Sequence, residues 1–118
     1  MEYMLMIYSD PAAFEAMSPA QKQEGLAAYG AYHQALEKSG ALRASTRLRP
    51  AQAATTVRLT SGKTEVLNGP YAETREQLGG YFVVDVPDLD AAIAWAARCP
   101  GAAHGVVEVR PVWPMGAA

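Results

Sequence analysis

Two short apolar runs, at Tyr3–Tyr8 and Tyr81–Val86, constrain the fold more than any other feature of the sequence. Both runs are short and flanked by turn-forming residues, a pattern that favours a β-strand over a helix. Because side chains alternate along a strand, apolar residues occupy both faces of each run. We therefore expect strands that are covered on both sides.

The first helix is predicted from its end signals. Ser18, Pro19 and Gln21 form a capping-box start, and the helix is expected to run to Ser39, with Gly40 as the left-handed terminating residue. Positions three and four residues apart then place one stripe of side chains toward the core. That predicted stripe consists of Leu26, Tyr29, His33 and Leu36.

The remaining elements complete a single domain over residues 1–118. A second helix is expected between the N-cap Asp88 and Cys99. Further strands are predicted at 41–49, 54–59 and 63–67, which read as a β meander, and at 106–109. Right-handed connections then favour the α+β class and a ferredoxin-like sandwich, in which two helices cover one face of an antiparallel sheet.

The second face of that sheet has no helix to cover it. An exposed apolar patch of several hundred Å² is unusual on a monomer, and both Tyr3–Tyr8 and Tyr81–Val86 contribute to it. We therefore expect a homodimer in which a second copy covers this face.

Composition excludes several classes of protein. Of the 118 residues 19% are charged, the net charge is -2, and no Lys/Arg cluster occurs, so we expect no direct nucleic-acid partner. No apolar run approaches the length of a membrane span. Cys99 is the single cysteine, and with His33 and His104 it matches no zinc-ligand spacing. We expect a cytoplasmic protein without a metal or cofactor.

A longer stretch, Asn68–Tyr81, resembles the YCII-related family and specifically its DGPF-domain branch, of the dimeric α-β barrel group. Val86–Asp90 and Glu108–Val112 fit the same resemblance, as does the opening strand. The resemblance implies ferredoxin-like protomers whose sheets pack back to back. Two departures are visible: Asn68 replaces the aspartate of the motif, and Tyr71 replaces its phenylalanine.

The resemblance also implies roles. Some YCII relatives act on small aromatic compounds through a histidine on the first helix and an aspartate before a proline after the second helix. In this sequence Tyr29 stands near the histidine position, and Cys99 stands where the aspartate would be. Members of the family are frequently associated with extracytoplasmic-function sigma factors, although no residue here identifies such a contact.

His33 and Glu73 are the candidate catalytic residues. His33 is the natural general base if it faces a pocket, because histidine exchanges protons near neutral pH; the alternative is a hydrogen-bonded packing residue. Glu73 and Glu76 lie three residues apart and share a face in a helical segment. With Arg75 between them, a solvated loop or a local salt-bridge cluster is the competing interpretation.

Four residues are candidate ligand contacts: Tyr29, Asn68, Tyr71 and Glu76. The polar loop of residues 68–77 is expected to form the rim of a pocket whose wall is the His33 side of the first helix. Asn68 cannot transfer a proton as an aspartate does, so a turn role competes with ligand contact.

Three functions remain open from the sequence. The first is a homodimeric domain that binds a small organic molecule, with no assignable reaction. The second is an enzyme that performs proton transfer or elimination on a small aromatic substrate. The third is an interaction module associated with a sigma factor.

Overall fold

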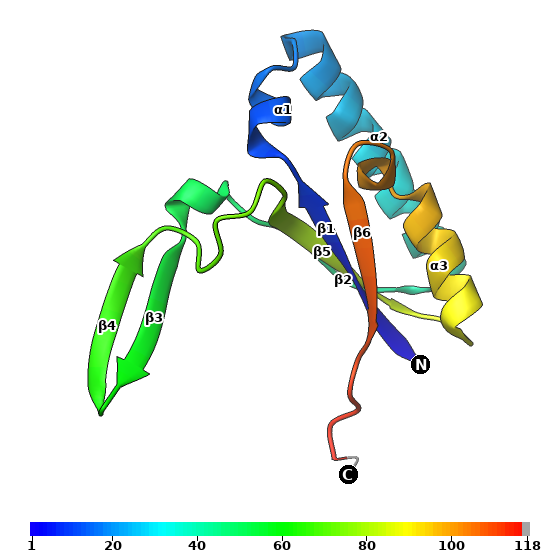
Figure 1. The fold of residues 1–118 in the computed structure, drawn as a ribbon. Helices are drawn as coiled ribbons and strands as arrows, with labels where there is room; N and C mark the ends of the chain where they lie inside the picture. Colours follow the sequence, from blue (N-terminus) through cyan, green and yellow to red (C-terminus); the bar gives the residue numbers. More distant parts are fainter. Residues whose placement is uncertain (117–118) are drawn as a thin grey trace.

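The protein folds around a four-stranded antiparallel sheet, as the computed structural model shows for residues 1–116 (Figure 1). The strand order is β2-β5-β1-β6. The strands are β1 (Glu2–Ser9), β2 (Leu42–Arg47), β5 (Gln77–Asp85) and β6 (Val106–Pro111). The chain is thus of the predicted α+β class, and this order is compatible with a ferredoxin-like fold.

Both long helices, α2 (Pro19–Ser39) and α3 (Leu89–Arg98), lie on the same side of the sheet (Figure 1). The predicted capping box is present, because the Gln21 amide donates to Ser18 Oγ at 3.1 Å and Gln21 Oε1 accepts from the Ser18 amide at 2.9 Å. Gly40 ends α2 in the left-handed region at φ 79°. The sequence did not predict the short helix α1 (Pro11–Glu15).

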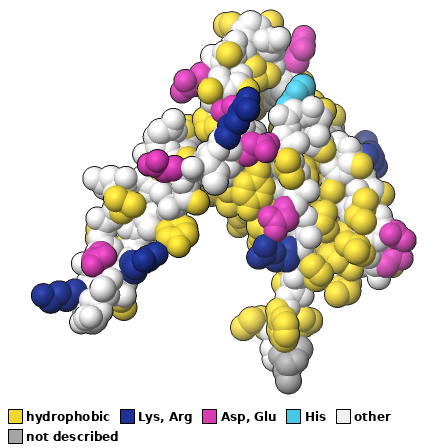
Figure 2. All heavy atoms as spheres, viewed as in Figure 1, with side chains coloured by type: hydrophobic (Ala, Val, Ile, Leu, Met, Phe, Trp, Pro, Cys, Tyr) yellow, Lys and Arg dark blue, Asp and Glu magenta, His cyan; other side chains and the backbone are white. Residues whose placement is uncertain are grey.

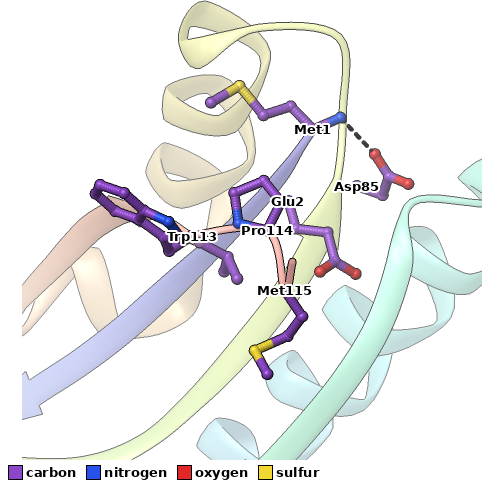
Figure 3. A pocket seen from close by; sticks show the side chains of 7 residues that line it. Met1, Glu2, Asp85, Trp113, Pro114 and Met115 are labelled. Carbon is purple, nitrogen blue, oxygen red and sulfur yellow. Dashed lines mark hydrogen bonds and ion pairs between the residues drawn. The ribbon is translucent and has the colours of Figure 1, made fainter. Parts of the chain in front are cut away.

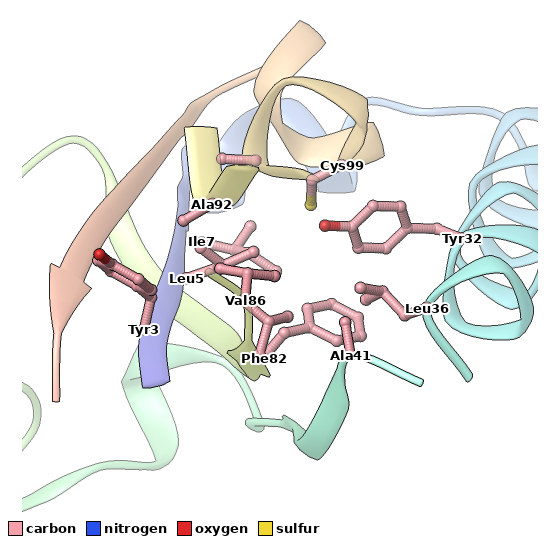
Figure 4. Packing of buried hydrophobic residues seen from close by; sticks show 12 residues of the cluster. Tyr3, Leu5, Ile7, Tyr32, Leu36, Ala41, Phe82, Val86, Ala92 and Cys99 are labelled. Atoms are coloured by element: carbon pink, nitrogen blue, oxygen red, sulfur yellow. The ribbon is translucent and has the colours of Figure 1, made fainter. Parts of the chain in front are cut away.

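The hydrophobic core fills the space between these helices and the sheet (Figure 4). Leu5, Leu36 and Val84 are fully buried at its centre. The Tyr32 ring meets the Phe82 ring edge-on, with 5.2 Å between centroids. The core also contains Tyr3, Ile7, Ala41, Val86, Ala92, Ala96 and Cys99.

The predicted inward stripe of α2 is partly wrong. Leu26 is 60% exposed, whereas Tyr32, which was not in the stripe, is buried. Tyr29 packs against the core and Leu36 lies within it, so the observed stripe passes through Tyr29, Tyr32 and Leu36. The first half of α2 extends past the end of the sheet (Figure 1), so Leu26 meets no partner layer.

Within the described part of the chain, residues 1–116, no helix covers the other face of the sheet. Antiparallel register places Met4 beside Val83 and Met6 beside Tyr81 on this face. All four side chains are only half-buried. The sheet is therefore apolar on both faces, as predicted, while only one of them is covered by the chain itself.

The middle of the chain departs from the predicted meander. β3 (Thr55–Thr60) and β4 (Lys63–Asn68) pair only with each other, as a separate two-stranded sheet that projects away from the main sheet (Figure 1). Strand β2 pairs instead with β5. The chain leaves β2 through Pro50, which cannot donate to a strand ladder, and the 3₁₀ turn η1 (Ala51–Ala53).

Strand β5 begins at Gln77, four positions before the predicted start at Tyr81. Gly79 and Gly80 belong to this strand, and Gly80 does so for a steric reason. A Cβ on Gly80 would lie 2.6 Å from the carbonyl oxygen of Thr46, so only glycine lets β2 approach this closely.

No helix among residues 1–116 is both long and apolar enough to cross a membrane.

Candidate functional site

Tyr29, Cys99 and Gly101 meet where α2 and the turn η2 (Pro100–Ala103) approach the same end of the sheet. The Cys99 Sγ atom lies 3.9 Å from the Tyr29 hydroxyl oxygen. A Cβ on Gly101 would lie 2.5 Å from that hydroxyl oxygen and 2.8 Å from Cγ2 of Ile7. The absence of a side chain at Gly101 therefore lets the turn pack against both α2 and β1.

Both titratable groups of this cluster keep their protons at neutral pH. Burial raises the pKa of the Tyr29 hydroxyl above its ordinary value. Burial also raises the pKa of the Cys99 thiol, which is 2% exposed and lies at the C-terminal end of α3. Cys99 is therefore a packing residue, and the pair offers neutral hydrogen-bonding groups rather than a base or a nucleophile.

Arg47 brings a positive charge to the same region. It is the last residue of β2 and pairs with Gly80, which in turn pairs with Ile7 beside Gly101. Burial has the largest effect on the Tyr29 hydroxyl and raises its pKa, and the positive charge of Arg47 offsets a small part of that rise. The guanidinium is therefore near enough to influence the Tyr29 hydroxyl electrostatically.

A concavity of about 270 Å³ opens at this end of β2, lined by Arg47, Leu48, Arg49 and Pro50. The Leu48 amide donates to the Gly79 carbonyl at 2.9 Å and fixes the segment to the start of β5. Within residues 1–116, neither arginine forms an ion pair with a carboxylate. Two arginines thus line this open concavity at the end of β2.

His33 lies one helical turn beyond Tyr29 and is partly exposed. Its Nδ1 atom lies 2.6 Å from Oε1 of Glu37, the residue four positions later on α2. The His33 ring is tilted over Phe82, with 6.4 Å between ring centroids. Glu37 is 59% exposed, so this pair sits at the edge of the helix layer.

Glu73 and Glu76 are exposed in the loop that precedes β5. This loop is fixed by Gln77, whose side-chain amide donates to the Thr74 carbonyl at 2.6 Å. Five residues separate Gln77 from the Phe82 that contacts His33, a distance of about 17 Å along an extended strand. The structure therefore brings His33 to Glu37 and does not bring it to Glu73.

The cation of this loop has another partner. Arg75 Nε lies 3.2 Å from Oδ2 of Asp10, at the end of β1. The backbone amide of Ala12 and then Arg75 hold the pKa of the Asp10 carboxyl below its ordinary value. The salt bridge expected around Arg75 exists, but it ties the loop to β1 instead of joining Glu73 and Glu76.

Asn68 and Tyr71 lie at the base of the β3–β4 hairpin. Asn68 is the last residue of β4 and pairs with Thr55. Tyr71 is 75% exposed, and the Arg58 guanidinium carbon lies 5.6 Å from its ring centroid. These two residues are thus grouped with the hairpin and not with Tyr29.

A second concavity, of about 280 Å³, lies at the opposite end of the sheet (Figure 3). Two of its charged groups pair with each other, because the N-terminal ammonium lies 2.8 Å from Asp85 Oδ1; Arg43, outside the lining, lies 3.3 Å from Asp85 Oδ2. Its other lining residues are Glu2, Val112, Trp113, Pro114 and Met115.

The described residues hold no group of three or more side chains suited to a metal ion.

The model of the YCII-related domain matches residues 1–116 of this chain. The chain belongs to the YCII-related family. It is also similar to an uncharacterised protein from Rhizobium meliloti, with 34% identity over 114 residues that cover 95% of this chain and 92% of the relative.

Within this YCII-related domain, the contact of Tyr29 with Cys99 joins two positions that the sequence resemblance singled out. The side chains of these two residues lie 3.9 Å apart. Arg47 and Gly101 were missed by sequence reasoning. No local signal marks Arg47, because its place opposite Gly80 depends on strand register.

Proposed function

We propose that this chain is a homodimeric, DGPF-branch YCII-related protein of the cytoplasm that binds a small organic anion, without an assignable reaction. One observation carries the ligand class: Arg47, which forms no ion pair among the described residues, lines an open concavity and acts electrostatically on the Tyr29 hydroxyl. A guanidinium binds a carboxylate through two parallel hydrogen bonds, and a neutral hydroxyl adds a third donor.

The protonated state of Tyr29 and Cys99 favours ligand binding over acid-base catalysis. Tyr29 and Cys99 both have a pKa raised by burial, so neither supplies a base near neutral pH. Leu48 and Pro50 give the concavity an apolar wall beside its two cations. Such a lining suits a small molecule with a carboxylate and an apolar body.

The dimer is supported by the helix-free face of the sheet. Met4, Met6, Tyr81 and Val83 lie side by side there and remain half-exposed in a single chain. Burial of apolar area contributes about 25 cal/mol per Å², so a second copy covering this face gains stability from it. In the proposed dimer the two sheets pack face to face, and each protomer keeps its own ligand site on the helix side.

A thermal-shift screen with small aliphatic and aromatic carboxylates tests the binding proposal. A ligand at 100 times its Kd stabilises the native state by about 2.7 kcal/mol, a shift that such a screen detects. For benzoate or another stabilising acid, Arg47→Gln is expected to raise Kd at least tenfold. Arg58→Gln removes a charge from the hairpin instead and serves as the matched control. Equal Kd values for wild type and Arg47→Gln would overturn the proposal.

An enzyme remains the second candidate because His33 has a carboxylate at 2.6 Å. In that function His33 accepts a proton from a small aromatic substrate. Glu37 orients the His33 ring, in place of Glu73, the carboxylate that the sequence suggested. A reaction abolished by His33→Gln but unchanged by Arg47→Gln would favour it. The association with a sigma factor stays a prediction from the family resemblance.

A further inference from the structure

Two arginines, Arg47 and Arg49, line the same concavity at the end of β2. Of the described residues that line it with them, none is acidic. The arginines that form ion pairs within residues 1–116 are Arg43, Arg75 and Arg110. On the face of the molecule that Figure 2 shows, Lys and Arg side chains lie apart from one another. The concavity therefore gathers two positive charges, and the described part of the chain pairs neither with a carboxylate.

The backbone places these two arginines in a defined relation to each other. Arg49 precedes Pro50, and the residue before a proline is restricted to extended conformations. Between the arginines, the Leu48 amide donates to the Gly79 carbonyl at 2.9 Å and fixes the segment to β5. Side chains two positions apart in extended backbone lie on one side, with about 6–7 Å between their Cα atoms. The bases of the two arginine side chains are thus placed before any ligand binds.

Apolar surface accompanies the two charges. Leu48 and Pro50 alternate with the arginines along the chain and line the same concavity, and Leu48 is 41% exposed. A ligand that carries both of its charges on one group, as phosphate does, would leave this apolar surface in water. A carbon chain between two anionic groups covers the apolar surface and pairs with both guanidinium groups.

The volume of the concavity limits the size of the ligand. A volume of about 270 Å³ is equivalent to about nine water molecules at about 30 Å³ each. It is slightly smaller than the pockets of about 300 Å³ or more that hold drug-sized molecules. Glutarate, with two carboxylates on a chain of three methylene groups, has about nine non-hydrogen atoms and fits this volume.

We propose that the anion bound at this concavity is a short dicarboxylate, with one carboxylate bound by Arg47 and the other by Arg49. This inference rests on the proposed function and deepens it by adding a second charge to the ligand. Each guanidinium binds one carboxylate through two parallel hydrogen bonds. A monocarboxylate of the same size leaves one guanidinium to water, so the second carboxylate raises affinity without a larger contact area.

Chemical-shift titration of the ¹⁵N-labelled full chain with glutarate and with glutaramate tests the inference. Glutaramate has the same carbon chain, but an uncharged amide replaces one carboxylate. We expect glutarate to bind at least tenfold more tightly than glutaramate at low salt, where charged pairs are least screened. Arg49→Gln is expected to reduce this ratio to less than threefold. Arg58→Gln, which removes an exposed charge from the β3–β4 hairpin, should leave the ratio unchanged.

Both substituted arginines are exposed, so circular dichroism should show wild-type folding for each variant. Glutarate and glutaramate Kd values within threefold of each other would overturn the dicarboxylate and leave a site for a single carboxylate intact. Equal weakening of both ligands by Arg49→Gln would overturn the pairing of Arg49 with the second carboxylate.

Two further ligands complete the test. Inorganic phosphate that binds more tightly than glutarate would assign both arginines to one doubly charged group and overturn the carbon-chain ligand. Failure of glutarate, glutaramate and benzoate to bind at 10 mM would overturn the proposed function itself, and this inference with it.

Discussion

Replacing Gly80 with alanine is expected to destabilise the protein because this position has no room for a side chain. The added Cβ would lie 2.6 Å from the Thr46 carbonyl oxygen and 3.4 Å from the Arg47 Cα atom. Both atoms belong to the backbone of β2, which cannot rotate away as a flexible side chain does. Strand β2 must therefore move away from β5, and Arg47 moves with it.

The magnitude follows from two opposing effects. Forcing an extra methyl group into a packed region costs about 1–3 kcal/mol. Alanine also restricts the unfolded chain and offsets about 0.4–1 kcal/mol of that cost. The expected net loss for Gly80→Ala is about 1–2 kcal/mol, which lowers Tm by about 4–10 °C for a domain of this size.

Gly30→Ala is the matched control. Gly30 lies within α2, and an added Cβ there would meet nothing within 4 Å. Alanine is favoured over glycine in a helix by about 1 kcal/mol, so this variant is expected to be more stable than wild type. Urea unfolding followed by circular dichroism measures both changes. A Gly80→Ala variant as stable as wild type would refute the packing of β2 against β5 described above.

Three further predictions concern single groups. Tyr32→Phe removes the hydrogen bond of 2.7 Å to the Trp95 carbonyl, and urea unfolding should show a loss of about 1–3 kcal/mol; unchanged stability would contradict the bond. Ser18→Ala should cost about 1 kcal/mol in the same assay, and a loss near zero would refute the capping role. Burial raises the pKa of the Cys99 thiol in the folded state. The stability that the protonated thiol contributes is therefore fully present below the unfolded-state pKa of about 8.5 and is lost as pH rises above that value. Cys99→Ala should make that fall in the urea midpoint shallower, and an equally steep fall would contradict this origin.

Local signals in the sequence predicted the elements of this fold well. The Ser18 cap and the Gly40 terminus act over one helical turn, so their outcome depends on neighbours that the sequence itself supplies. The alternation in Tyr3–Tyr8 likewise predicted a strand that is apolar on both faces. The side on which both helices pack followed from connection rules that hold for most α+β domains, whereas the sequence predicted a meander in place of the observed strand pairing.

Non-local pairing accounts for what the sequence could not predict. Leu26 is an apolar residue of the kind found in cores, but it lies where α2 passes the end of the sheet. The independence of the β3–β4 hairpin follows from the pairing of β2 with β5, which no local pattern specifies. The contact of His33 with Glu37 could have been predicted, since residues four apart are neighbours on a helix. The position of Arg47 opposite Gly80 depends on sheet register and could not.

The most direct test of the ligand site is a titration of ¹⁵N-labelled protein with benzoate, followed by amide chemical shifts. The account predicts that the largest changes fall on the amides of Arg47, Leu48 and Arg49 and on Gly101, with smaller changes in the loop of residues 70–77. Changes confined to that loop, or to the exposed side of α2 around His33, would contradict the placement of the site.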